Sequence, residues 1–126
     1  MRLSRRLRQM RDDSLELNSN QLSAMGVLLN SGDQLMGALA AAEKVQPPSM
    51  TRIVKGLEER GYVARRPDPS DRRQCFVTLT DEGKKVLIAN RRRRDHWLAI
   101  RLAELTPAER EVLRQCVGIL DKVNHA

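Results

Sequence analysis

The chain has 126 residues and a formal net charge of +7. This length is typical of a single domain, and the positive charge favours a polyanionic partner: nucleic acid, an anionic membrane surface or an acidic protein. The opening residues MRLSRRLRQMRDD contain no apolar stretch, and no apolar run is long enough to span a membrane. The sequence therefore predicts neither a signal peptide nor a membrane span, and predicts a cytoplasmic protein.

Three helices are predicted in the first third of the chain. Apolar residues recur at helical spacing within residues 2–17 and predict the first helix. Asn18, followed three residues later by Gln21, predicts a capping box at the start of the second. The sequence NSGD at 30–33 predicts a loop, and the alanine-rich stretch from Leu35 to about Glu43 predicts a short third helix.

The clearest helical pattern in the sequence runs from about Pro48 to Arg60. Its apolar residues recur at i, i+3, i+4 and i+7. Proline suits the first positions of a helix because the missing N–H has no helical partner there, and Gly61 is placed to end the helix. The apolar stripe comprises Met50, Ile53, Val54 and Leu57, and the opposite face carries Pro48, Thr51, Arg52 and Lys55.

A β-hairpin is predicted directly after this helix. Residues 62–66 form the first strand candidate, the sequence PDPSD at 67–71 has the composition of a turn, and residues 74–79 form the return strand. Strand alternation places Cys75, Val77 and Leu79 on one face, with Phe76 and Thr78 on the other.

Two more helices complete the prediction. Thr80 is suited to cap a long fifth helix, in which residues 90–96 have no apolar member and indicate a bridge between two packed regions. Thr106, Pro107 and Glu109 predict a second capping box. The last helix carries an apolar stripe formed by Leu113, Cys116, Val117, Leu120 and Val123.

Two short helices, a tight turn and a basic hairpin are typical of a winged helix-turn-helix, whose second helix enters the major groove of DNA. An arginine at the hairpin tip can insert into the minor groove, and Asp71 is expected to hold that arginine in a bidentate pair. The alternatives are a solvated helix face and a hairpin whose charges only protect its edge. The predicted DNA-binding residues are Pro48, Ser49, Thr51, Arg52, Lys55, Arg65, Asp71, Arg72 and Arg73.

The stretch from Leu35 to Gly83 resembles the MarR (multiple antibiotic resistance regulator) family. The family's wing signature reads aspartate, any residue, arginine, three residues, valine, any residue, Leu-Thr, two residues and glycine. It is filled here by Asp71, Arg73, Val77, Leu79, Thr80 and Gly83. The PPSMTR segment at 47–52, the long basic fifth helix and the LTPAER start of the last helix also match.

The resemblance implies a mainly α fold with a small β-hairpin wing (α+β), as one MarR-type domain over residues 1–126. The winged helix-turn-helix lobe would cover about 19–88, and the dimerisation helices about 1–18 and 89–126. The resemblance also implies that residues at Ser49, Thr51 and Arg52 contact DNA, that Arg73 enters the minor groove, and that Asp71 orients it.

The function implied is that of a bacterial repressor. It would bind double-stranded DNA at an inverted-repeat operator as a homodimer, with no cofactor, and a small aromatic or phenolic ligand would release it. Two other interpretations stay open from the sequence: a nonspecific architectural DNA-binding protein and a winged-helix protein-interaction module.

The remaining chemically notable residues are predicted to be structural. Cys75 and Cys116 lie on apolar faces, where a free cysteine behaves as a small hydrophobic residue. His96 and His125 are too few for a metal site, and Trp97 fits a dimer core. Since no nucleophile–base pair, glycine-rich phosphate loop or paired-carboxylate motif is present, the sequence predicts no enzyme.

Overall fold

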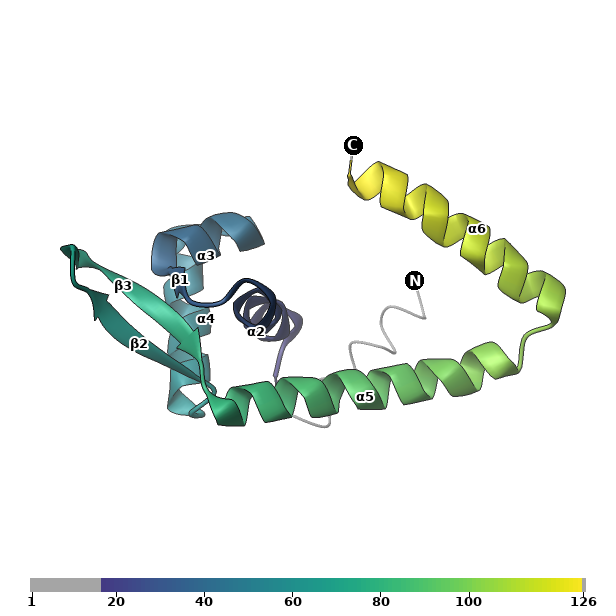
Figure 1. Ribbon diagram of the computed structural model, residues 1–126, viewed down its shortest axis with the longest axis horizontal. Coiled ribbons are helices and arrows are strands. Elements are labelled where there is room, and N and C mark those ends of the chain that lie inside the picture. Colours follow the sequence, from purple (N-terminus) through teal and green to yellow (C-terminus); the bar gives the residue numbers. More distant parts are fainter. Residues whose placement is uncertain (1–16, 126) are drawn as a thin grey trace. The chain divides into compact units, whose positions relative to one another are not determined.

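The computed structural model describes residues 17–125, so the predicted first helix lies outside the described residues except for Leu17. The chain divides into two compact units, Met1–Arg92 and Arg93–Ala126. The division falls inside the polar stretch 90–96. In chain order the elements are α2 (Ser19–Ser31), β1 (Gln34–Leu35), α3 (Met36–Glu43), α4 (Pro47–Glu59), β2 (Val63–Asp68), β3 (Asp71–Leu79), α5 (Asp81–Ala103) and α6 (Pro107–Asn124) (Figure 1).

The start of α2 confirms the first predicted capping box. The Asn18 side chain accepts a hydrogen bond from the Gln21 amide at 2.8 Å, and the Asn18 amide donates to Gln21 Oε1 at 3.1 Å. The helix continues to Ser31, so the predicted loop at 30–33 starts too early. Gly32 ends the helix with φ of 78°, a conformation that a residue without Cβ adopts without strain.

The wing is a three-stranded antiparallel sheet in the order β1-β3-β2. The sequence did not predict β1, and placed Leu35 in a helix. Gln34 and Leu35 instead lie opposite Val77 and Phe76. A two-residue strand shows no alternation, and this one exists only because β3 supplies its hydrogen-bonding partner.

The hairpin strands are longer than predicted. β2 continues to Asp68 and β3 already begins at Asp71, so only Pro69 and Ser70 lie between them. The predicted five-residue turn is therefore wrong, because backbone pairing holds residues whose composition suggested a turn. The alternation of Val77 and Phe76 is as predicted, with Val77 fully buried.

The core of the first unit lies between α2, α3, α4 and the base of the wing. The predicted stripe of α4 faces this core: Met50, Val54 and Leu57 are fully buried and Ile53 is partly buried. Because this face is fixed by burial, the opposite face of α4 is directed outward. The buried apolar residues are Leu17, Leu22, Ala24, Met25, Leu28, Leu39, Ala40, Met50, Val54, Leu57, Val63, Val77 and Leu87.

The second unit contains the end of α5 and α6, and α6 confirms the second capping box. The Thr106 hydroxyl accepts from the Glu109 amide at 3.2 Å, and the Thr106 amide donates to Glu109 Oε1 at 2.9 Å. The prediction that Cys116 packs in a core is wrong within the chain, since Cys116 is exposed together with its apolar stripe. Among the described residues no helix is long and apolar enough to cross a membrane.

Candidate nucleic-acid interface

The turn before α4 determines how this helix is presented. Lys44 adopts a left-handed conformation with φ of 55°, which is uncommon for a residue other than glycine. The Lys44 amide donates to Ala41 O at 3.1 Å, and the Val45 amide donates to Ala40 O at 3.0 Å. The turn thus closes α3 tightly, and α4 begins at Pro47, one residue before the predicted start.

The outward face of α4 carries the predicted helix residues. Pro48, Thr51, Arg52 and Lys55 are exposed and Ser49 is half-buried. The Thr51 hydroxyl donates to Pro47 O at 3.0 Å, so its oxygen keeps lone pairs that can accept a hydrogen bond. Within the described part of the chain, neither Arg52 nor Lys55 has an ion-pair partner, and both cations are available to an external anion.

Arg73 is the most exposed basic side chain among the described ion pairs, at 90%. Asp71 holds it, although not in the bidentate pair that the sequence predicted. One oxygen, Asp71 Oδ1, accepts from the Arg73 amide at 3.0 Å and from Arg73 Nε at 3.2 Å. The base of the side chain is therefore fixed, while the two terminal nitrogens of the guanidinium remain available.

The turn at the tip of the wing is fixed by Asp68. Its Oδ1 accepts from the Ser70 amide at 2.9 Å and from the Ser70 hydroxyl at 2.8 Å. These hydrogen bonds, the backbone one first, lower the pKa of the Asp68 carboxyl below its ordinary value. A rigid tip reduces the conformational freedom that Arg72 and Arg73 would lose on binding.

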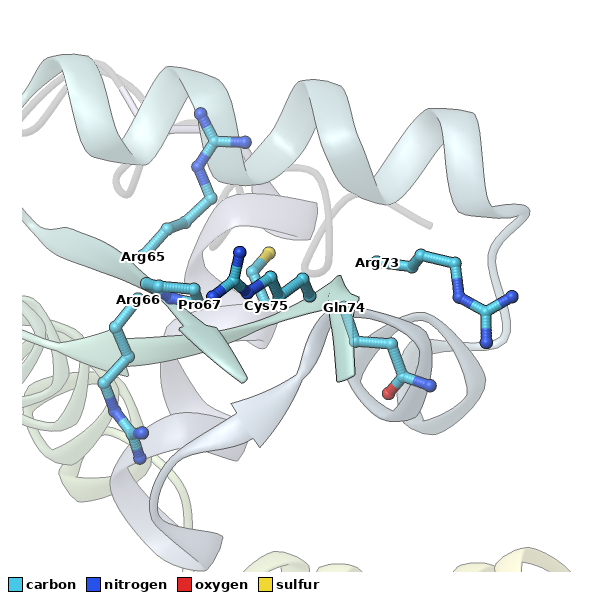
Figure 2. A pocket seen from close by; sticks show the side chains of 7 residues that line it. Arg65, Arg66, Pro67, Arg73, Gln74 and Cys75 are labelled. Carbon is cyan, nitrogen blue, oxygen red and sulfur yellow. The ribbon is translucent and has the colours of Figure 1, made fainter. Parts of the chain in front are cut away.

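Arg65 and Arg66 leave β2 in opposite directions, as Figure 2 shows. Arg65 Nε and Nη2 donate to the two carboxylate oxygens of Glu58 at 3.1 and 2.8 Å. Arg66 pairs with Asp33 at 3.3 Å, and its guanidinium lies 4.3 Å from the centroid of the Phe76 ring. The two arginines therefore join the wing to different parts of the unit.

Glu58 was not predicted from the sequence as a site residue, although a signal was available. Glu58 follows Lys55 by three residues and Thr51 by seven, so it continues the same helical row. It also precedes Arg65 by seven residues, but nothing in the sequence shows that the helix and the strand bring these two side chains together.

Two hollows lie at this surface, one between α4 and the wing and one within the wing. One, of about 460 Å³, brings Thr51 of α4 together with Arg65 and Arg73; its other lining residues are Leu35, Met36, Gly37, Ala38, Gln74 and Cys75. The second, of about 310 Å³, is lined by Arg65, Arg66, Pro67, Arg72, Arg73, Gln74 and Cys75 (Figure 2). Cys75 is half-buried at this surface, not enclosed in the core as predicted.

Comparison with known proteins decides the family. A model of the MarR family matches residues 17–75. An uncharacterised HTH-type transcriptional regulator of Mycobacterium bovis, Mb0904, is 45% identical over 120 residues, which cover 95% of this chain and 83% of the relative. The chain belongs to the MarR family. A second relative, ML2140 of Mycobacterium leprae, described in the same words, is 41% identical with the same coverage.

Solved structures support the MarR fold. YusO of Bacillus subtilis is 26% identical with a TM-score of 0.78, covering 98% of this chain and 88% of that protein. RV1404 of Mycobacterium tuberculosis is 24% identical with a TM-score of 0.85, covering 98% of this chain and 84% of that protein. The winged helix-turn-helix prediction is confirmed. The protein is a DNA-binding transcriptional regulator of the MarR family, and this membership confirms the non-enzymatic class.

Proposed function

We propose that this MarR regulator is a cytoplasmic repressor that binds an inverted-repeat operator as a homodimer. The observation that carries the proposal is the exposed guanidinium of Arg73, held at its base by Asp71 and lining one hollow with Thr51 of α4. A helix in the major groove beside a cation in the adjacent minor groove would use both parts of this surface.

The side chains of α4 suit distinct contacts with the duplex. The Arg52 guanidinium can donate two hydrogen bonds to the edge of a guanine, whereas Lys55 suits phosphate as a point charge. Ser49 and Thr51 offer hydroxyls to base edges or phosphates, and the Pro48 ring is an apolar surface for a thymine methyl group. Arg72 and Arg73 supply the wing contacts, and Asp71 contributes by holding Arg73.

The homodimer proposal is supported by α6, whose apolar stripe is exposed along its length. A two-fold dimer presents two α4 helices to half-sites about one helical turn apart, roughly 34–36 Å, which is why an inverted repeat is expected. We also propose that a small aromatic or phenolic ligand releases the protein from DNA. That proposal is supported only by the family resemblance.

The operator is first identified by using purified protein to select bound duplexes from a random pool. On the selected duplex, Arg73→Ala should weaken binding by about 1–3 kcal/mol, which is roughly 5- to 150-fold, and reduce the salt slope by about 1. Arg114→Ala, on α6, removes the same charge from the second unit and is the control. Normal operator binding by Arg73→Ala would remove the wing from the mechanism.

The same measurements separate the other interpretations. An architectural protein would bind the selected and random duplexes with a ratio near one, and a protein-interaction module would shift neither at moderate salt. Adding phenolic acids to the protein–operator complex tests release by a ligand. If no phenolic acid tested changes the operator affinity, that part of the proposal fails for this ligand class.

A further inference from the structure

The DNA-facing row of α4 ends in a carboxylate. Glu58 lies one turn beyond Lys55 and two turns beyond Thr51, and its side chain is 36% exposed. A carboxylate beside a duplex repels phosphate oxygens. An acidic residue in this position therefore weakens binding to any DNA, unless it acts on another residue of the same surface.

Glu58 has such a partner in the wing. Both of its oxygens accept from Arg65, at 2.8 and 3.1 Å, and this pair joins α4 to β2. The hydrogen bonds from Arg65 lower the pKa of the Glu58 carboxyl, and those to Glu58 raise the pKa of the Arg65 guanidinium. A guanidinium and a carboxylate meeting by two parallel bonds have a defined geometry as well as complementary charge.

Stability does not account for this pair, because exposed ion pairs contribute little to the free energy of unfolding. The pair has a larger effect on the charge that Arg65 presents at this surface. Arg65 lines the hollow between α4 and the wing and also the hollow within the wing, where a free guanidinium would meet the phosphate backbone of any duplex. Paired with Glu58, the guanidinium has two of its five donors occupied and its charge neutralised.

We propose that Glu58 is a specificity-determining residue that holds Arg65 back from sequence-independent phosphate contacts and so keeps binding to non-operator DNA weak. The inference rests on the proposed interface of α4 and the wing. It gives Arg65 a different role from the direct DNA contact predicted from the sequence. Specificity is a ratio of affinities, and it rises when binding to the wrong partner is penalised.

The test compares Glu58→Gln with Glu59→Gln in the full chain. Both substitutions remove one negative charge from α4, but Glu59 has no ion pair within the part of the chain that the structure describes. Glu58→Gln should raise affinity for a random duplex about three- to tenfold more than Glu59→Gln does, and steepen its salt slope by about 1. The operator-to-random ratio should fall only in Glu58→Gln, because base contacts hold α4 in one register on the operator and leave Arg65 less freedom to reach a phosphate there than on a random duplex.

The double variant Glu58→Gln/Arg65→Gln has the net charge of the wild type. It should bind random duplex as the wild type does, because the released guanidinium is gone. Equal effects of Glu58→Gln and Glu59→Gln, or raised random-duplex affinity that persists in the double variant, would overturn the inference. Unfolding temperatures confirm that each variant is folded.

Failure of the inference is distinguishable from failure of the proposed function. If the wild-type protein shows no preference for any selected duplex, operator binding itself is refuted. If the wild type selects an operator while Glu58→Gln and Glu59→Gln behave alike, only the role of Glu58 is refuted.

Discussion

Asp33 links the segment before β1 to the outer face of the hairpin. It is bound by the Thr78 side chain and by Arg66, whose guanidinium also covers the Phe76 ring. The hydrogen bond from Thr78, and then that from Arg66, lower the pKa of the Asp33 carboxyl below its ordinary value of 3.8. The charged form of Asp33 is thus favoured in the folded protein.

This pKa shift predicts a pH dependence of stability. Because the pKa of Asp33 is lower in the folded than in the unfolded chain, its contribution is fully present above the ordinary value of 3.8 and is lost as the pH falls through the lowered value. Asp33→Asn should therefore be less stable than the wild type at pH 6–7. The difference should shrink below about pH 4 in urea unfolding measured from pH 7 to 2.

The wild type at low pH provides the control for Asp33→Asn, since its carboxyl is then neutral as well. A stability difference that stays constant from pH 7 to 2 would show that the loss comes from the shape of the amide and not from the charge of Asp33.

At the residue scale, the sequence predicted which residues belong to the candidate site better than it predicted which side chains pair with one another. Through the resemblance to the family's wing signature, it identified Asp71 as the residue holding Arg73, two positions further along the same strand. It did not predict that a single oxygen does so. Pairing of Arg65 with Glu58, and of Arg66 with Asp33, depends on how helix, sheet and loop pack. Local spacing carries no information on those contacts.

The start of α5 requires a glycine. The Thr80 hydroxyl donates to Gly61 O at 2.7 Å and accepts from the Gly83 amide at 3.0 Å, and the Thr80 amide donates to Tyr62 O at 3.1 Å. These bonds draw the first turn of α5 against the backbone of the segment before β2. A Cβ on Gly83 would collide with Tyr62 O and press on the Leu79 side chain.

Gly83→Ala should accordingly destabilise the first unit, by about 1–3 kcal/mol, because the colliding atom belongs to the backbone and cannot rotate away. Thermal and urea unfolding measure the change. Gly37→Ala, within α3, is the matched control: a Cβ there meets nothing within 4 Å, and alanine favours the helix by up to about 1 kcal/mol. Equal unfolding free energies for the two variants would contradict the close approach at Gly83.

At the element scale, the predictable features were those encoded within a few residues. The capping boxes at Asn18 and Thr106 join residues three apart, and the apolar stripe of α4 repeats over about two turns. The strand β1 could not be predicted, because a separate strand creates it. The polar stretch 90–96 was predicted to bridge two packed regions, yet its first residue, Asn90, is buried.

Among the described residues, the second unit leaves an apolar surface of α6 uncovered. No residue of α6 is buried, and Val117, Leu120 and Val123 are 56%, 64% and 69% exposed. Exposed apolar side chains gathered along one helix face are typical of an interaction surface. In the proposed homodimer, the same face of a second copy is the occupant, so that the stripe becomes part of a shared core.

Leu120→Glu should therefore dissociate the dimer. Full burial of a leucine contributes about 1.5–3 kcal/mol, so its loss should raise the dimer dissociation constant at least about tenfold, and a charge facing the partner adds to this.

Gln115→Glu introduces the same residue and the same charge about 140° around α6 from Leu120 and is the control. Sedimentation equilibrium should show a dimer for wild type and Gln115→Glu, and a monomer for Leu120→Glu, which should also bind the operator more weakly. A Leu120→Glu protein that remains dimeric would place the dimer contact outside the α6 stripe.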